Sequence, residues 1–263
     1  MKILKCFKIK YFIICIWLFL YSSPYVMANH PIIALGVNHA PPYSFVEENS
    51  DSSGLIIDIM QRIGSELDFE LQVVSCPFPR CLKMAKEGKL DILGGLVKTE
   101  ERNQYLDFIE PAYMALNSSY VFYSLKEKNL VVNEYEQLKD KRIAVMRNAA
   151  YFELFDSDAA LNKIIVSSEK VAVDMLLKDR VDLVIAVEET ADYSIKFLKQ
   201  ASHRLQKLNY RHTDNILGYA AISRKYQNIE LLNKIKQKMR QFQKSGVLTQ
   251  LVKPYNLPPI NKP

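Results

Sequence analysis

One arginine in a short segment has the clearest potential for chemistry. Arg102 lies in the stretch from Gly88 to Tyr113, GKLDILGGLVKTEERNQYLDFIEPAY. The pattern predicts a buried strand over Leu90–Leu96, a Gly-Gly loop, and a helix that starts at Thr99 with Arg102 in its first turn. Free backbone N–H groups at a helix N-terminus and a forked guanidinium both favour a small anion. The segment therefore predicts an anion pocket and leaves open whether the anion is bound or processed.

Alternating strands and helices must position this pocket. Short apolar runs predict strands over Ile32–Val37 and Phe69–Val74, because buried strands read as continuous apolar stretches. From Leu55 to Leu67 the apolar residues recur at helical spacing, which predicts an amphipathic helix. A short helix is expected over Leu82–Glu87, because Gly88 supplies a common C-terminal signal.

A second unit of the same kind follows. We expect strands over 117–124, 142–146, 163–166, 181–187 and 219–223. Residues 151–155 are expected to start a helix, and further helices are expected over 168–178, 190–198 and 229–242. In the helix over 168–178, Val171, Met175 and Leu176 are expected to face inward. The run Asp179–Leu183 is similar to Gly88–Ile92, which suggests two similar lobes. This alternation is typical of an α/β protein.

The N-terminus predicts a cleavable export signal over residues 1–28. Four lysines precede an apolar run, Tyr11–Tyr21, that is too short to span a bilayer comfortably. Small residues then favour cleavage between Ala28 and Asn29, and so a periplasmic mature protein. Two alternatives stay open. One is a lipoprotein at Cys15, which the bulky Ile14 disfavours, and the other is an uncleaved membrane anchor.

The charge of the mature chain is nearly balanced. Removing the leader takes away four lysines and no acid, which lowers the formal net charge from +6 to +2. This balance, without a Lys/Arg cluster among aromatic residues, argues against an electrostatic nucleic-acid binder.

Cys76 and Cys81 are the two cysteines of the mature chain. An even pair in an exported chain is most simply a disulfide. A Cys-x4-Cys metal site is the alternative, although zinc needs further ligands. The four histidines show no metal or triad spacing, so neither a metal nor a cofactor is predicted.

Five motifs in order give the chain a family resemblance. They are Pro41-Pro42-Tyr43, Gly54-Leu55-Ile56-Ile57-Asp58, Gly88-Lys89-Leu90-Asp91, Thr99-Glu100-Glu101-Arg102 and Asp107-Phe108-Ile109-Glu110-Pro111-Ala112-Tyr113. This arrangement resembles the family 3 extracellular solute-binding proteins, periplasmic receptors for polar amino acids and related compounds. The resemblance covers essentially the whole mature chain.

The resemblance implies a two-lobe, periplasmic-binding-protein-like type II fold with an interlobe cleft. Residues 29–116 plus 214–263 would form the first lobe, and residues 117–213 the second. Two β-strand crossovers, Ala115–Phe122 and Asn215–Ile222, would join the lobes as hinges that close over ligand. The protein is expected to be a monomer.

The resemblance also implies ligand-binding residues in the first lobe. Arg102 would grip the ligand's α-carboxylate; the alternative is a surface arginine that bridges to Glu100 or Glu101. Thr99 would contact ligand or act only as a helix N-cap. Gly95 and Leu96 would present backbone groups to the cleft.

Three further side chains could border the same cleft. Tyr43 would stack on or wall the ligand, unless it is a core aromatic under its loop. Phe78 would be a second cleft aromatic. Arg80 could reach acidic ligand groups or remain solvated.

The second lobe departs from the amino-acid-binding pattern. Those relatives carry a Gly-Thr/Ser-Thr run where this chain has Arg147–Ala150, which leaves Asn148 as the candidate. They place an aspartate for the α-ammonium after the strand that corresponds to Val181–Ala186. Here Glu188 could serve with a shift of one residue. The carboxylate grip is therefore expected, while recognition of a free α-amino group stays open.

Three function classes remain. The leading one is a receptor without chemistry that delivers its ligand to an inner-membrane ABC permease. The second is a dehydratase-like enzyme on the same scaffold, which would need a positioned acid or base. The third is a ligand-sensing or accessory protein that serves no permease.

Overall fold

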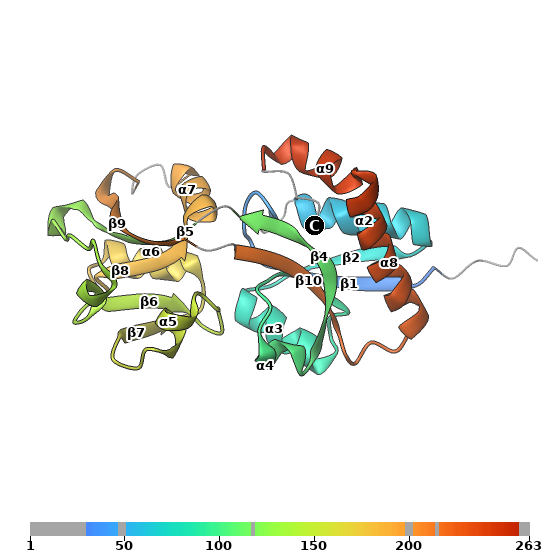
Figure 1. The fold of residues 1–263 in the computed structure, drawn as a ribbon, viewed down its shortest axis with the longest axis horizontal. Coiled ribbons are helices and arrows are strands. Elements are labelled where there is room, and N and C mark those ends of the chain that lie inside the picture. The colour runs from blue at the N-terminus through green and yellow to red at the C-terminus, as the bar shows by residue number, and fades with distance from the viewer. Residues whose placement is uncertain (1–29, 47–50, 117–118, 198–201, 214–215, 258–263) are drawn as a thin grey trace, which may run out of the picture. The chain divides into compact units, whose positions relative to one another are not determined.

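The computed structural model describes residues 30–46, 51–116, 119–197, 202–213 and 216–257 (Figure 1). The predicted leader, 1–28, lies outside the described residues. So do residues 117–118 and 214–215, which belong to or adjoin the two predicted hinges.

The first sheet has five strands in the order β2-β1-β3-β10-β4. These strands are β1 (Ile32–Val37), β2 (Glu70–Ser75), β3 (Ile92–Leu96), β4 (Leu106–Leu116) and β10 (Ile216–Ser223). The strand β1 runs parallel to β2 and β3, whereas β10 is antiparallel to β3 and β4. The last strand of the chain therefore returns between two strands from its first half.

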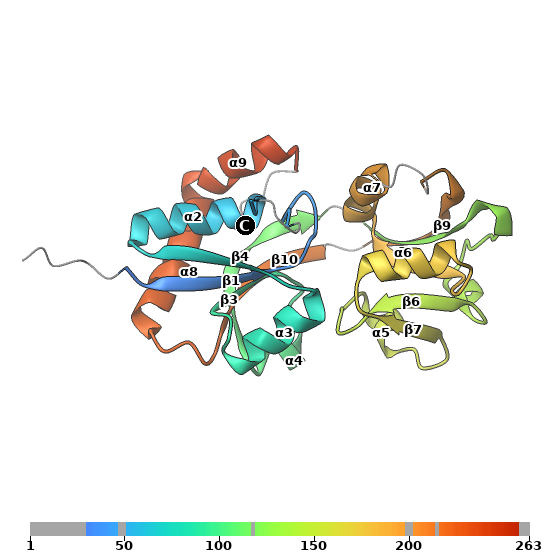
Figure 2. The same cartoon turned by 180° about the vertical axis from the view of Figure 1, so that it is seen from behind.

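Helices cover both faces of this sheet. The helices α2 (Leu55–Leu67), α8 (Ile229–Ser245) and α9 (Val247–Val252) lie on one face, and α3 (Phe78–Glu87) lies on the other (Figures 1 and 2). The helical spacing of apolar residues in α2 produces its buried stripe, which includes Ile59 and Ile63. We call this sheet, its helices and α4 (Glu100–Asn103) the first lobe.

The second sheet also has five strands, in the order β7-β6-β8-β5-β9. They are β5 (Ser119–Leu125), β6 (Arg142–Met146), β7 (Asn162–Val166), β8 (Leu183–Val187) and β9 (Leu205–Thr213). The strand β6 runs parallel to β7 and β8, and β5 is antiparallel to β8 and β9.

This sheet and its helices form what we call the second lobe. Its α-helices are α5 (Glu153–Ser157), α6 (Glu169–Leu177) and α7 (Glu188–Phe197). The views in Figures 1 and 2 place α5 and α6 on opposite faces of the sheet. Short 3-10 turns occur at η1 (Lys126–Lys128), η2 (Tyr135–Leu138), η3 (Ser202–Arg204) and η4 (Lys253–Tyr255).

The similar segments Gly88–Ile92 and Asp179–Leu183 form the same hydrogen bond, from the backbone amide of a neighbouring strand to an aspartate. In the first lobe, the Ala34 amide donates to Asp91 Oδ2 at 2.8 Å. In the second lobe, the Arg142 amide donates to Asp182 Oδ2, also at 2.8 Å. Each aspartate joins the entry to a central strand, β3 or β8, to the neighbouring β1 or β6.

Most predicted elements are confirmed within a few residues, with informative exceptions. The helix α3 begins at Phe78 rather than Leu82, because Pro77 and Pro79 occupy the cap and first turn, where proline fits a helix. The expected inward position of Val171 is wrong: this residue is 37% exposed, and Ala172 and Leu176 form the buried face.

Three of the strands and α-helices have no counterpart among the predictions. The strand β4 is one of them, because only the end of Leu106–Leu116 overlaps a predicted element, the hinge that begins at Ala115. The strand β9 carries the polar sequence LQKLNYRHT and pairs only with β5, at the edge of its sheet. The six-residue helix α9 follows Gly246, which ends α8 in a left-handed conformation.

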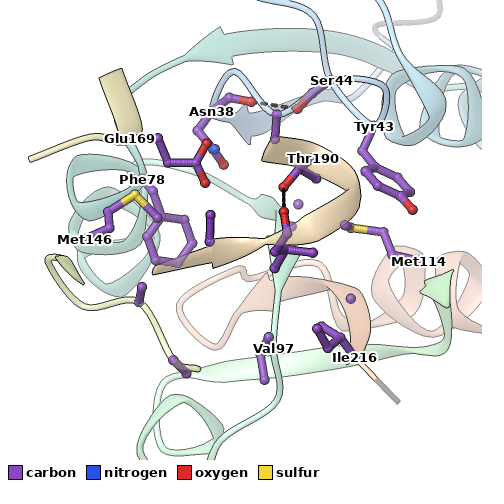
Figure 3. Close-up of a pocket in the computed structure, with 18 of the residues that line it drawn as sticks. Asn38, Tyr43, Ser44, Phe78, Val97, Met114, Met146, Glu169, Thr190 and Ile216 are labelled. Carbon is purple, nitrogen blue, oxygen red and sulfur yellow. Dashed lines mark hydrogen bonds between the residues drawn. The ribbon is translucent and has the colours of Figure 1, made fainter. Parts of the chain in front are cut away.

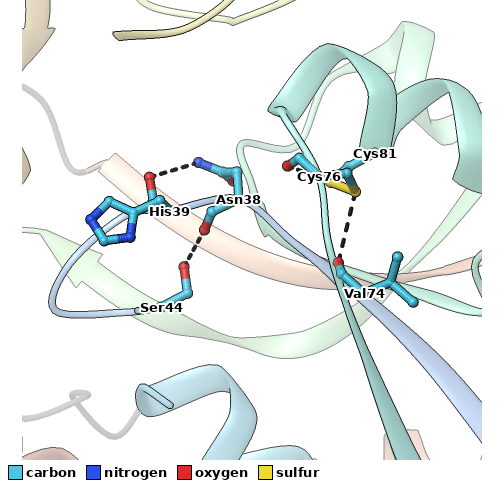
Figure 4. Close-up of a disulfide and its surroundings, with 6 residues drawn as sticks. All are labelled: Asn38, His39, Ser44, Val74, Cys76 and Cys81. Carbon is cyan, nitrogen blue, oxygen red and sulfur yellow. Dashed lines mark hydrogen bonds between the residues drawn. A yellow bond between two sulfur atoms is a disulfide. The ribbon is translucent and has the colours of Figure 1, made fainter. Parts of the chain in front are cut away.

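The predicted disulfide between Cys76 and Cys81 is confirmed, with 5.5 Å between the Cα atoms. Because bonded sulfurs are not thiolate ligands, the pair does not form the alternative metal site. The Cys76 amide donates to the Val37 carbonyl at 3.0 Å. The bridge thus joins α3 to the residue that follows β2, and the hydrogen bond of Cys76 connects that residue to the end of β1, beside the loop that contains Asn38 and Ser44 (Figure 4).

Candidate functional site

A cavity of about 140 Å³ is lined by residues from both lobes (Figure 3). This volume is below the roughly 300 Å³ at the lower end of drug-sized pockets, so the cavity suits a small molecule. First-lobe lining residues include Asn38, Tyr43, Ser44, Phe78, Gly94, Gly95, Val97 and Arg102. Second-lobe lining residues include Tyr120, Met146, Ala149, Ala150, Tyr151, Glu169, Val187 and Thr190.

Arg102 is buried at this cavity, with 4% of the residue exposed. Its backbone amide donates to Thr99 Oγ1 at 3.2 Å, so Thr99 caps the short helix α4. The guanidinium lies over the Phe78 ring, 5.5 Å from its centroid. It donates to the carbonyls of Val97 at 2.6 Å and Asn148 at 2.8 Å. These contacts hold the side chain between the lobes.

The charge of Arg102 lacks a protein counter-ion in the part of the chain that the structure describes. Burial lowers the pKa of Arg102, yet an arginine side chain stays protonated in proteins. Its two hydrogen bonds to backbone carbonyls use only part of the five N–H groups of a guanidinium. A buried charge is costly unless it is paired. The site therefore favours an incoming anion that the remaining donors can bind.

The loop after β1 forms another part of the wall. The Ser44 hydroxyl donates to the Asn38 carbonyl at 2.6 Å, which fixes the loop. Tyr43 packs edge-on against Tyr113 at 6.5 Å between ring centroids. The Tyr43 hydroxyl is 3.5 Å from Glu189 Oε2, at the limit of a hydrogen bond across the lobes. Burial raises the pKa of Tyr43, so the phenol stays neutral.

Two glycines allow the backbone to border the cavity where β3 ends. Gly95 has a φ of +76°, a conformation that side chains other than glycine's rarely adopt. A Cβ atom on Gly94 would lie 3.1 Å from an Ile56 side-chain carbon. The Gly95 amide donates to the Tyr113 hydroxyl at 2.8 Å, which fixes the turn.

The second lobe contributes two polar side chains from the first turns of helices. The Thr190 hydroxyl, in α7, donates to the Val187 carbonyl at 3.1 Å. Glu169 begins α6, after the cap Ser168. Glu169 is exposed as a residue. The protein around its carboxyl nevertheless removes part of the water that would stabilise the negative charge, and this desolvation raises the pKa of the group.

Four of the nine predicted ligand-binding residues line the cavity: Tyr43, Phe78, Gly95 and Arg102. The other five, Arg80, Leu96, Thr99, Asn148 and Glu188, are not among the lining residues.

Each of these five has a different environment. The Leu96 side chain is buried in the core of the first lobe, and Arg80 is exposed. Thr99 acts as the helix cap, and Asn148 contributes its backbone carbonyl to Arg102 while its side chain is exposed. Glu188 forms ion pairs with two cations of β9, at 2.7 Å to Lys207 and 3.2 Å to Arg211. Its carboxylate is therefore engaged within the second lobe.

Sequence reasoning missed Asn38, Glu169 and Thr190 as cavity residues. Asn38 directly follows β1, and Glu169 and Thr190 each lie three residues after a parallel strand of the second sheet. In α/β sheets, ligands bind outside the carboxyl ends of the strands. That rule, applied to each predicted strand, could have identified all three.

Among the described residues, no helix is long and apolar enough to cross a membrane. The same part of the chain holds no group of three or more histidine, cysteine, aspartate or glutamate side chains able to bind a metal ion.

Residues 32–258 match the family model of the bacterial extracellular solute-binding proteins, family 3. This match covers most of the chain, and the protein belongs to that family. The site just described thus lies in the scaffold of a solute-binding protein.

Similar proteins support the fold assignment. A probable histidine-binding protein of Campylobacter jejuni is 25% identical over 233 residues, which cover 86% of each chain. An ancestral arginine-binding protein bound to arginine is similar in structure, with a TM-score of 0.70 and 22% identity over 86% of this chain and 99% of that one. A histidine kinase sensor domain with similarity to periplasmic binding proteins has a TM-score of 0.72, with 17% identity over 88% and 99% of the two chains. The predicted two-lobe fold is confirmed.

Proposed function

We propose that this chain is an exported receptor that binds a small carboxylate-bearing solute, an amino acid or a related compound, and delivers it to an ABC permease. The observation that carries the proposal is the buried guanidinium of Arg102, which borders the cavity without a carboxylate partner among the described residues. A planar carboxylate can accept two parallel hydrogen bonds from such a fork. Family membership and the names of the histidine- and arginine-binding relatives support this ligand class.

The proposal includes export and a purely binding role. Residues 1–28 serve as a signal peptide, cleaved between Ala28 and Asn29, and the mature chain acts as a periplasmic monomer. The proposed role is binding without chemistry on the ligand, which the description of the family as solute-binding proteins supports.

Hinge closure is proposed as the mode of binding. The lobes are divided as residues 29–116 plus 214–263 and residues 117–213. The bond from Arg102 to the Asn148 carbonyl supports this mode, because it connects the lobes at the cavity. Closure over a ligand would remove water and strengthen each polar contact.

A thermal-shift screen of the mature protein tests the ligand class. The library contains amino acids and small carboxylates, each beside its amide or decarboxylated analogue. A ligand at 100 times its Kd should add about 2.7 kcal/mol to the free energy of unfolding. For a chain of this length that is a rise of about 5–10 °C in Tm. The analogues without a carboxylate should give no rise, and equal rises for both members of each pair would refute the proposal.

An uptake assay separates transport from sensing. Cells that lack this chain should lose high-affinity uptake of the ligand found in the screen. Normal uptake together with a lost transcriptional response to that ligand would instead indicate a sensory accessory protein.

A further inference from the structure

We infer that Glu169 binds a positively charged group of the ligand, so that the cavity selects solutes carrying both a carboxylate and an organic cation. The inference rests on the proposed function and extends it to a second recognition residue. The positive group can be the α-ammonium or a cationic side chain, and the experiment below distinguishes these sources.

The charges that line the cavity are one of each sign. Among the described lining residues, Arg102 is the only one with a formal positive charge and Glu169 the only one with a negative charge. The others are apolar, aromatic or neutral polar residues. A ligand with a carboxylate for Arg102 and a cation for Glu169 would leave neither charge uncompensated after closure.

The start of α6 directs Glu169 into the cavity. Ser168 accepts a hydrogen bond from the Val171 amide at 3.3 Å, which fixes the first turn of this nine-residue helix. In Figure 3 the Glu169 carboxyl points toward the space bordered by Asn38 and Phe78 of the first lobe. A group on the second lobe that faces the first lobe is well placed to contact a ligand held between them.

The two acidic residues at the start of α7 are less suitable. Glu188 does not line the cavity, and it already pairs with Lys207 and Arg211. Glu189 also lies outside the lining, where it accepts the hydrogen bond from Tyr43. By contrast, no described side chain forms an ion pair or hydrogen bond with the Glu169 carboxylate.

The rest of the lining suits an organic cation better than a metal ion. The aromatic residues Phe78, Tyr120 and Tyr151 border the same cavity as Glu169. Aromatic faces attract ammonium and guanidinium groups. A single carboxylate does not supply the several oxygen ligands that a hard metal ion needs.

Calorimetric titration of Glu169→Gln tests the inference. The matched control is Glu153→Gln, because Glu153 is also an exposed glutamate in the first turn of a second-lobe helix but does not line the cavity. The probes are L-arginine, L-histidine, L-glutamine, N-acetyl-L-arginine and succinate. We expect Glu169→Gln to weaken binding of probes with the recognised cation by about 10-fold or more, and to leave succinate binding unchanged or tighter.

The pattern among the probes identifies the source of the cation. Loss of affinity for L-arginine and N-acetyl-L-arginine, with L-glutamine unaffected, would assign a side-chain cation. Loss for L-arginine and L-glutamine, with N-acetyl-L-arginine unaffected, would assign the α-ammonium. Glu169→Asp, which keeps the charge, should recover part of the affinity, and an unchanged Tm should show that both variants fold.

Two outcomes would overturn the inference in distinguishable ways. Carboxylate ligands that bind the wild type and Glu169→Gln equally well, whatever their positive groups, would refute the role of Glu169 but leave the proposed function standing. If the wild type binds only compounds without a carboxylate, the proposed function fails, and the inference fails with it.

Discussion

The two lobes share one backbone arrangement but strengthen it differently. In each, the turn after a helix contains a residue with positive φ, Gly88 at 78° after α3 and Asp179 at 55° after α6, and an aspartate follows three residues later. Asp91 and Asp182 each accept a hydrogen bond from the amide of a neighbouring strand at 2.8 Å. The shared element therefore depends on a turn and one carboxylate.

The difference lies in the side chain on that neighbouring strand. In the second lobe it is Arg142, which also donates from its guanidinium to Asp182 at 2.8 and 3.1 Å. This pairing lowers the pKa of Asp182. The first lobe has Ala34 in the equivalent position, and an alanine side chain cannot form an ion pair with Asp91. A hydrogen bond to the backbone therefore suffices to build the unit, and an ion pair adds to it in the second lobe only.

The lobes also differ in what they bring to the cavity. The first lobe presents a buried cation, Arg102, held by backbone carbonyls. The second lobe presents Glu169, which lines the cavity and is exposed to solvent. The guanidinium of Arg102 is thus held in place by hydrogen bonds within the protein. The carboxylate of Glu169 has no such bond to a described side chain.

Removing the two aspartates should give the largest difference between the lobes. We expect Asp182→Ala to lower the free energy of unfolding by about 2–3 kcal/mol, because a hydrogen-bonded charge pair is lost. Partial exposure of the pair limits this value. Asp91→Ala should cost about 1–2 kcal/mol, since only the bond to a backbone amide is lost. Urea unfolding measures both.

Two further variants make this comparison decisive. Asp174→Ala, an exposed position of α6, should change stability by less than about 0.5 kcal/mol. In an Arg142→Ala background, Asp182→Ala should cost no more than Asp91→Ala. An equal or larger cost for Asp91→Ala in the wild type would show that the ion pair adds nothing.

A smaller effect is expected at the positive-φ residues. Gly88→Ala should destabilise by about 1–2 kcal/mol, because the left-handed conformation disfavours a Cβ atom. The new Cβ would also lie 2.9 Å from Lys225 Cβ. Asp179→Gly should change the free energy of unfolding by less than about 0.5 kcal/mol. Glycine adopts the positive φ of this position without strain, and this gain offsets the loss of the surface ion pair with Lys128. Thermal unfolding of both variants would reveal the contrast, and a neutral Gly88→Ala would contradict it.

The sequence predicts well where local pattern and packing agree. The helix α2, with its stripe of isoleucines, and the strand β1 lie where periodicity places them, and Arg102 lies in the first turn after Thr99. The strand β9 was not predictable in this way, because its polar residues mask the alternation of a half-buried edge strand.

The differences between the predicted site residues and the lining of the cavity have a related cause. Glu188 looked available for ligand because its two partners, Lys207 and Arg211, lie on that unpredicted strand. Glu169 lies just after the carboxyl end of β7, where the rule for α/β sheets indicates ligand-binding residues, but that rule does not say which side chain there faces the other lobe. Residues whose role is set within one turn were thus predictable, and those set across the cavity could be narrowed only to the ends of strands.

The central claim is that Arg102 binds the carboxylate of the ligand, and a chemical double-mutant cycle tests it most directly. Calorimetry would compare the wild type with Arg102→Ala, each titrated with the ligand from the screen and with its amide. We predict a coupling free energy of about 1.5–3 kcal/mol, the range for hydrogen bonds to charged groups, with the amide nearly insensitive to the substitution. Changes that add within about 0.5 kcal/mol would contradict the claim, because Arg102 and the carboxylate would then act independently.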